Sequence, residues 1–78
     1  MRKTLYSPEY IKLTQWLKNE RMRNGLSMRE LAKLLDVPHS FIGKIEQGER
    51  RLDIIEYISY CNALQIKPEH GFTILNTI

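Results

Sequence analysis

Apolar residues recur along this 78-residue chain at steps of three to five positions, which is the spacing of one face of an α-helix. No segment alternates apolar and polar residues as a strand does. Start and stop signals divide the pattern into five expected helices, running from Pro8 to Asn24, from Ser27 to Leu35, from His39 to Gln47, from about Asp53 to Leu64, and from Pro68 to the end. The pattern therefore predicts an all-α, five-helix bundle and a single domain spanning residues 1–78.

Local signals place most of these helix ends. Ser7 is a good N-cap and is followed by a proline, which suits the first helical position. Ser27 and Glu30 fit a capping box, in which each side chain accepts a hydrogen bond from the other residue's backbone amide. Pro38 disfavours helical geometry at the residue before it, and Gly48 is expected to end the third helix.

The same periodicity predicts which side chains face the core. The expected inward residues are Tyr10, Leu13, Leu17 and Met22 in the first helix, Leu31, Ala32, Leu34 and Leu35 in the second, Phe41, Ile42 and Ile45 in the third, and Ile54, Ile55, Ile58, Cys61 and Leu64 in the fourth. Trp16 and the tyrosines are expected to have ordinary packing roles, with Tyr57 and Tyr60 as possible interface residues.

Composition narrows the class of protein. With 42% hydrophobic and 27% charged residues, the chain has the balance of a globular protein rather than of a disordered segment. Its one cysteine excludes an internal disulfide and suits a buried thiol in a reducing cytosol. No apolar stretch approaches the roughly 18 residues needed to span a bilayer, and the N-terminus lacks the apolar run of a secretory signal. We therefore expect a cytoplasmic protein without a membrane partner.

Both the charge and the helix spacing indicate a nucleic-acid partner, but the charge is the weaker evidence. A net charge of +3 and an isoelectric point of about 9.2 fit a polyanionic partner, but many unrelated proteins are as basic. The second and third helices are more informative, because two short helices joined by a turn of three or four residues cross steeply, as in a helix-turn-helix. In that arrangement the second helix lies in the major groove of DNA and the first crosses the phosphate backbone.

The central part of the chain resembles the Xre/Cro/phage-repressor family of helix-turn-helix proteins. It reads "GLSMRELAKLLDVPHSFIGKIEQGERRLDIIEYISYCNALQIKPE", where family members have approximately Gly-Leu-Ser-Gln-x-x-Leu-Ala, a turn, Ile-x-x-Ile-Glu-x-Gly, and a helix ending in Ala-Leu. The resemblance covers Leu17 to Glu69, and the residues in register are Leu31, Ala32, Ile42, Ile45, Glu46, Gly48, Ala63 and Leu64. Two positions differ: Met28 replaces the usual Gln, and Gly43 replaces a longer polar residue. Both differences concern contacts with DNA rather than the fold.

The resemblance also implies roles for individual residues. The third helix would be the recognition helix, that is, the helix that lies in the major groove, with base contacts from His39, Ser40 and Lys44. The candidate contacts to the DNA backbone are Ser27, Met28, Arg29, Gly43, Gln47, Arg50 and Arg51, and the amides that begin the second helix can bind phosphate. Arg21 and Glu46 are implied to form a structural ion pair that orients the recognition helix.

The expected function is sequence-specific binding of double-stranded DNA by a small transcriptional regulator. One recognition helix contacts few base pairs, so we expect a homodimer on a palindromic operator. Residues 68–78 are the candidate dimerisation helix, through Phe72, Ile74, Leu75 and Ile78, and residues 1–6 are a candidate flexible arm. The alternatives within this class are a prophage repressor, a restriction–modification controller and the antitoxin of a toxin–antitoxin pair. Outside it, the alternative is a protein-interaction module that kept the fold and lost DNA binding.

The sequence contains no motif for enzyme, metal or cofactor chemistry. His39 and Ser40 are neighbours on a helix and project about 100° apart, so they cannot form a nucleophile–base pair. His39, His70 and Cys61 lack the spacing of zinc ligands. We therefore expect no catalysis, no cofactor, no metal and no small-molecule ligand.

Overall fold

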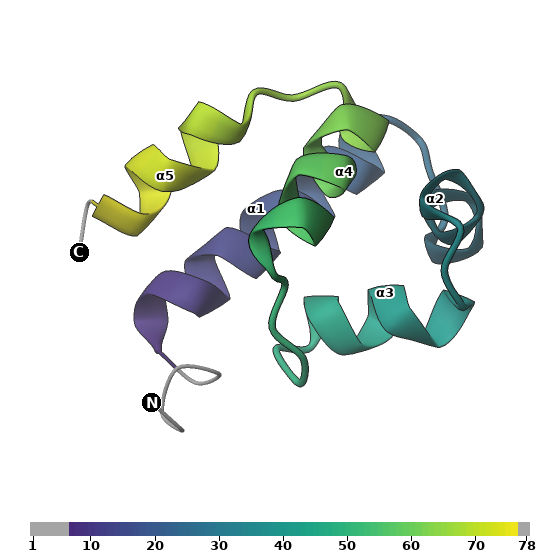
Figure 1. The fold of residues 1–78 in the computed structure, drawn as a ribbon, viewed down its shortest axis with the longest axis horizontal. Helices are drawn as coiled ribbons and strands as arrows, with labels where there is room; N and C mark the ends of the chain where they lie inside the picture. The colour runs from purple at the N-terminus through teal and green to yellow at the C-terminus, as the bar shows by residue number, and fades with distance from the viewer. Residues whose placement is uncertain (1–6, 77–78) are drawn as a thin grey trace.

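A computed structural model describes residues 7–76, and over this range the chain folds into helices without a strand (Figure 1). The helices are α1 (Pro8–Arg23), α2 (Met28–Leu35), α3 (His39–Glu46), α4 (Ile54–Leu64) and α5 (Pro68–Asn76). The prediction of an all-α fold of five short helices is therefore confirmed. No helix between Pro8 and Asn76 is both long enough and apolar enough to cross a membrane.

α1 and α4 lie between α3, the candidate recognition helix, and α5, the candidate dimerisation helix (Figure 1). α3 packs against α2 and α1, whereas α5 packs against α1 and α4. Figure 1 shows α3 along the lower edge of the molecule and α5 at the upper left, with α1 and α4 between them. The candidate recognition helix and the candidate dimerisation helix are thus on different sides of the scaffold.

Caps hold the helix ends where the sequence predicted them. The Ser7 hydroxyl accepts a hydrogen bond from the third residue of α1, and Ser27 and Glu30 form a complete capping box at α2. Asp53 and Glu56 form a second complete capping box at the start of α4. Reciprocal caps of this kind satisfy amides that the first turn leaves without partners, so short helices can begin at defined residues.

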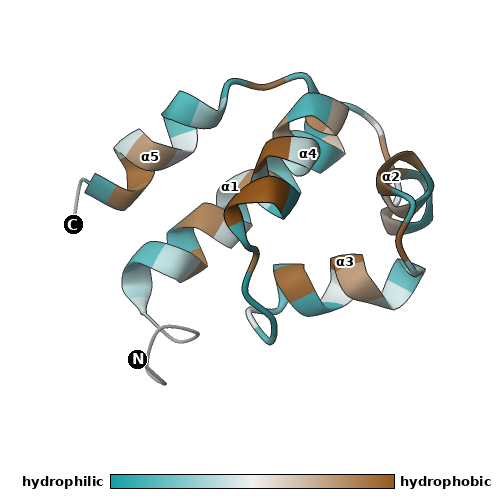
Figure 2. Ribbon diagram, in the orientation of Figure 1, coloured by the Kyte–Doolittle hydropathy of each residue, from teal (hydrophilic) through white to brown (hydrophobic). Residues whose placement is uncertain are grey.

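The core joins side chains from the first four helices. Its buried apolar members are Tyr10, Leu13, Leu17, Leu31, Ala32, Ile42, Ile45, Tyr57, Tyr60, Cys61 and Leu64. Figure 2 shows brown, apolar stretches on α2, α3, α4 and α5 beside teal, polar ones, as expected for amphipathic helices around a common core.

Four residues expected in the core are instead exposed. Met22, Leu34, Ile54 and Ile55 are 58%, 59%, 58% and 71% exposed, so the prediction that they face inward was wrong. Periodicity gives the side of a helix on which a residue lies, but it does not show whether another helix covers that side. Met22 lies in the last turn of α1, and the two isoleucines lie in the first turn of α4, where a helix end has fewer neighbours.

Tyr57 and Tyr60 pack in the core, as expected, and are not exposed as interface residues. They are 5% and 0% exposed, and burial raises the pKa of both phenols. The Tyr57 hydroxyl donates a hydrogen bond to the carbonyl of Pro68 at 2.6 Å and so fixes the start of α5. The Tyr60 hydroxyl is buried without a hydrogen-bond partner within residues 7–76. The packing of its ring must offset that cost.

Gly71 brings α5 close to the scaffold. A Cβ atom at this position would lie 2.0 Å from the Tyr57 hydroxyl oxygen and 3.0 Å from Cδ1 of Leu13. Gly43, in α3, is different because the nearest atom to a Cβ there would be the Met28 sulfur at 4.0 Å. Both glycines lie in helices, but only at Gly71 does the packing leave no room for a side chain.

We expect Gly71→Ala and Gly43→Ala to change stability in opposite directions. Helix propensity favours alanine at both positions, so Gly43→Ala should raise the free energy of unfolding by about 0.5–1 kcal/mol. Gly71→Ala should lower it by about 1–3 kcal/mol, because the new methyl group forces α5 away from Tyr57. Denaturant unfolding followed by Trp16 fluorescence measures both. Equal stabilisation by both substitutions would show that Gly71 is not required by packing.

Candidate nucleic-acid interface

The turn between α2 and α3 sets the direction of the candidate recognition helix. Asp36 ends α2 in the left-handed conformation, with φ 57° and ψ 49°. The next amide, of Val37, donates to the carbonyl of Ala32 at 3.0 Å and closes the last turn of α2. Pro38 is then extended, with φ −62° and ψ 148°, and α3 starts at the following residue. Such a tight connection leaves α2 and α3 packed together at a steep angle.

α3 has an apolar inner face and a polar outer face. Ile42 and Ile45 are 0% exposed and anchor the helix in the core. On the other side His39, Ser40, Lys44 and Gln47 are all exposed, and Gly43 between them is half-buried. The three candidate base-contacting residues therefore lie on the solvent side of one helix.

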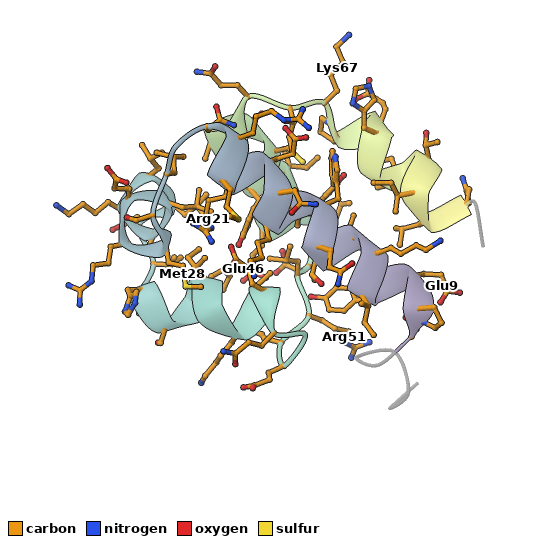
Figure 3. All side chains as sticks on the ribbon, turned by 180° about the vertical axis from the view of Figure 1, so that it is seen from behind. Glu9, Arg21, Met28, Glu46, Arg51 and Lys67 are labelled. Atoms are coloured by element: carbon orange, nitrogen blue, oxygen red, sulfur yellow. The ribbon has the colours of Figure 1, made fainter. Side chains whose placement is uncertain are left out.

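The start of α2 lies near this face, and its amides are partly occupied. Figure 3 shows Met28 beside α3. The backbone amide of Ser27 donates to Oε1 of Glu30 at 2.7 Å, so this amide already has a partner in the capping box. The Ser27 amide and hydroxyl lower the pKa of the Glu30 carboxyl, which keeps it ionised. The amides of Met28 and Arg29 are left as the candidate phosphate donors of this helix start.

Arg21 and Glu46 form an ion pair between α1 and the end of α3. Nε of Arg21 donates to Oε2 of Glu46 at 2.6 Å, and Nη2 donates to Oε1 at 3.1 Å. Nη1 donates to the carbonyl of Leu26 at 2.6 Å, in the loop before α2. The two side chains are only 10% and 3% exposed, and Figure 3 shows them together beneath α1. One guanidinium thus joins α1, the α1–α2 loop and the candidate recognition helix.

The two arginines after α3 have different surroundings. The guanidinium of Arg50 pairs with the Glu56 carboxylate through contacts of 3.0 and 3.1 Å, and its Cζ lies 4.5 Å from the centre of the Phe41 ring. The bidentate contact holds the pKa of Glu56 below its usual range. Arg51 is exposed, and Figure 3 shows it beyond the end of α3 opposite to Met28. The sequence predicted the same role for both arginines and could not show this difference.

Two of the candidate dimer residues, Phe72 and Leu75, line an apolar groove. Phe72 is 42% exposed, Ile74 and Leu75 are half-buried, and Ile78 lies outside the described residues, as do residues 1–6. The groove has a volume of about 670 Å³ and runs between α5, the start of α4 and α1. Ile54, which the sequence assigned to the core, also lines it. Within the described part of the chain, no three His, Cys, Asp or Glu side chains lie close enough to share a metal ion.

Comparisons with known proteins agree with this geometry. Residues 17–70 match the family described as "Helix-turn-helix". An Xre-family-like protein from Pseudomonas syringae pv. tomato is 35% identical, with a TM-score of 0.82 over 95% of this chain and 90% of that one. The restriction-modification controller protein C.AhdI from Aeromonas hydrophila is 30% identical, with a TM-score of 0.78 over 85% of this chain and all of the other.

A mutant of a second restriction-modification controller protein, C.Esp1396I, is 25% identical, with a TM-score of 0.78 over 88% of this chain and 87% of that one. A search of the curated proteins gave no match. The structural similarities cover between 85% and 95% of this chain.

We expect Glu46→Ala to reduce both stability and DNA affinity. It would leave the Arg21 guanidinium buried without its carboxylate, at a cost of about 3–5 kcal/mol in the free energy of unfolding. The control is Arg23→Ala, which removes the ion pair between Glu20 and an Arg23 side chain that is 75% exposed, and it should change that free energy by less than about 1 kcal/mol. Thermal unfolding measures both variants. A melting temperature for Glu46→Ala equal to that of Arg23→Ala would contradict the structural role of the ion pair.

Proposed function

The chain belongs to the Xre type of the helix-turn-helix family and is a DNA-binding transcriptional regulator, and we propose that it binds a palindromic operator as a homodimer. The observation that carries the proposal is the outer face of α3. Exposed polar side chains follow one another along a helix whose other face is anchored by Ile42, Ile45 and the Arg21–Glu46 ion pair.

Base contacts come from α3 in the major groove. Its first residues, His39 and Ser40, approach the base edges, as the first residues of a recognition helix do. The Lys44 ammonium, one turn later on the same face, is a donor to O6 or N7 of guanine. Gly43 between them has no side chain, so the helix backbone comes close to the DNA.

Backbone contacts come from both ends of this surface. At one end, the Met28 and Arg29 amides and the Arg29 guanidinium meet a phosphate beside the Ser27 cap. At the other end, Gln47 and Arg51 meet the backbone beyond α3. Contacts on either side of a helix fix its depth and its register in the groove.

The dimer forms through the groove beside α5. Phe72 and Leu75 contribute apolar surface from α5, and the exposed Ile54 adds apolar surface from the start of α4. Two copies related by a two-fold axis would place their recognition helices about one helical turn of DNA apart, roughly 34–36 Å. Dimerisation therefore supplies the specificity that one eight-residue helix cannot.

One narrower role is favoured by the comparisons. Two of the similar structures are restriction-modification controller proteins, so we propose this role before those of prophage repressor and antitoxin. Genes for a restriction endonuclease and a methyltransferase beside the gene for this chain would support it.

Selection from a random duplex library at about 150 mM salt tests the main proposal. We expect enrichment of a sequence with two-fold symmetry, because each protomer contacts one half-site. Light scattering on the same protein should give the mass of two chains.

Retention of duplexes without enrichment would mean that the protein binds the backbone only. No retention by a folded protein would favour an interaction module instead. A monomer at tens of micromolar, with and without the selected duplex, would contradict the dimer.

We expect Lys44→Ala and Arg51→Ala to affect binding differently. Losing a base contact should relax the preference at one or two positions of the selected site, at a cost of about 1–3 kcal/mol there. Losing a phosphate contact should weaken binding to every duplex and lower the slope of log affinity against log salt by about 0.9. Affinities for the selected and a scrambled duplex over a range of salt concentrations measure both effects. Identical behaviour of the two variants would contradict these roles.

A further inference from the structure

The side chain of Arg50 is held by three neighbours on two helices and the loop between them. Its Nη1 and Nη2 atoms donate to the two carboxylate oxygens of Glu56 in α4, and Nη1 also donates to the carbonyl of Arg51 at 3.1 Å. The guanidinium lies over the ring of Phe41 in α3, 4.5 Å from its centre. We propose that Arg50 is a positioning residue, which fixes α3 and the loop after it against α4, and that it does not contact the DNA backbone.

Glu56 connects the Arg50 contact to the start of α4. Its Oε1 atom accepts from the backbone amide of Asp53 at 3.0 Å, in the capping box, and also from Nη1 of Arg50 at 3.0 Å. The Glu56 carboxylate thus caps the start of α4, where the loop ends, and also binds Arg50, which lies within that loop. A lysine could not replace Arg50 here, because a single ammonium lacks the planar fork that fits both oxygens and stacks on Phe41.

The backbone of the loop is held as well. The carbonyl of Arg50 accepts a hydrogen bond of 2.5 Å from the hydroxyl of Tyr10, near the start of α1. The side chain and the carbonyl of one residue therefore tie the loop to α1, α3 and α4. In Figure 1 this loop extends below the end of α3 before it rises to α4, so its shape determines where the next residue, Arg51, meets DNA.

Charge supports the same division between the two arginines. The positive charge of Arg50 is balanced by Glu56, so the pair offers little net attraction to a phosphate. Turning Arg50 towards DNA would break a bidentate ion pair and a cation–π contact, and it would leave the Glu56 carboxylate near the negatively charged backbone. Arg51 takes part in no ion pair formed within residues 7–76. Its charge is available to a phosphate without any such loss.

The test compares the salt dependence of DNA binding, and it rests on the proposed function. The probes are the duplex enriched by selection and a scrambled duplex of the same base composition. The variants are Arg50→Ala, Arg50→Lys and Glu56→Gln, with Arg51→Ala as the phosphate-contact reference. Glu49→Gln is the matched control, because it removes a negative charge from the exposed neighbour of Arg50 in the same loop. Circular dichroism sets a temperature at which every variant is folded, so lost stability does not appear as lost affinity.

A positioning role predicts a specific set of results. Arg50→Ala should bind the selected duplex about tenfold more weakly with an unchanged salt slope, whereas Arg51→Ala should lower the slope by about 0.9. Arg50→Lys should not restore affinity. Glu56→Gln should weaken binding to the selected duplex although it removes a negative charge, and Glu49→Gln should not. The double variant of Arg50→Ala and Glu56→Gln should bind like either single variant.

Other results would overturn the inference. If Arg50 contacts a phosphate, its loss lowers the salt slope as that of Arg51 does, and Glu56→Gln strengthens binding by releasing the arginine. If Arg50 only stabilises the fold, the folded variants bind like the wild type. Failure of the wild type to bind either duplex would instead refute the proposed function, and is distinct from both outcomes. Should Arg50→Ala not fold, the sign of the Glu56→Gln effect still separates the two roles.

Discussion

The buried ion pair between Arg21 and Glu46 is the constraint on which the placement of α3 depends. Burying two charges is costly unless they are paired and hydrogen-bonded, and here the guanidinium meets both carboxylate oxygens and a backbone carbonyl. Apolar packing alone would hold α3 through only two fully buried side chains, Ile42 and Ile45. Such contacts tolerate small rotations, whereas a bidentate ion pair is directional. The pair therefore fixes the rotation of α3, and with it the direction in which its outer face points.

The candidate recognition helix, α3, has little stability of its own. It has eight residues, a central glycine, and a proline N-cap that supplies no side-chain hydrogen bond. Its geometry comes from its neighbours: the turn from α2 before it, the contact of Phe41 in its first turn with Arg50, and the ion pair of Glu46 at its last residue. Because the contacts that hold α3 come from its inner face and from the loop after it, the polar outer residues are available for DNA. The fold can be kept while the bases that are contacted change.

Much of the fold followed from local signals, and less of the site did. N-caps and capping boxes act within one turn of helix, so residues such as Ser27 and Asp53 predicted where helices begin. Exposure of Ile54 depends on which helix packs beside it, and periodicity has no information on that. The contact between Arg50 and Glu56 crosses a loop whose path no local pattern determines, so two adjacent arginines looked equivalent. The capping box of Ser27 and Glu30 also implied that the Ser27 amide has a carboxylate partner, which leaves the next amides of α2 as the candidate phosphate donors.

The distribution of charge shows why a count of basic residues overstates the positive charge that is free to attract DNA. Near the ends of α3, Arg21 and Arg50 are paired with Glu46 and Glu56, and their roles are internal to the protein. Arg29, Lys44 and Arg51 are exposed and carry the charge that a polyanion can meet. The net charge of +3 therefore says less about the candidate interface than the positions of Glu46 and Glu56, which show which arginines are already paired. In a chain this small, arginines serve both to hold α3 and, in the proposed function, to contact DNA, and the presence or absence of a carboxylate partner distinguishes the two sets.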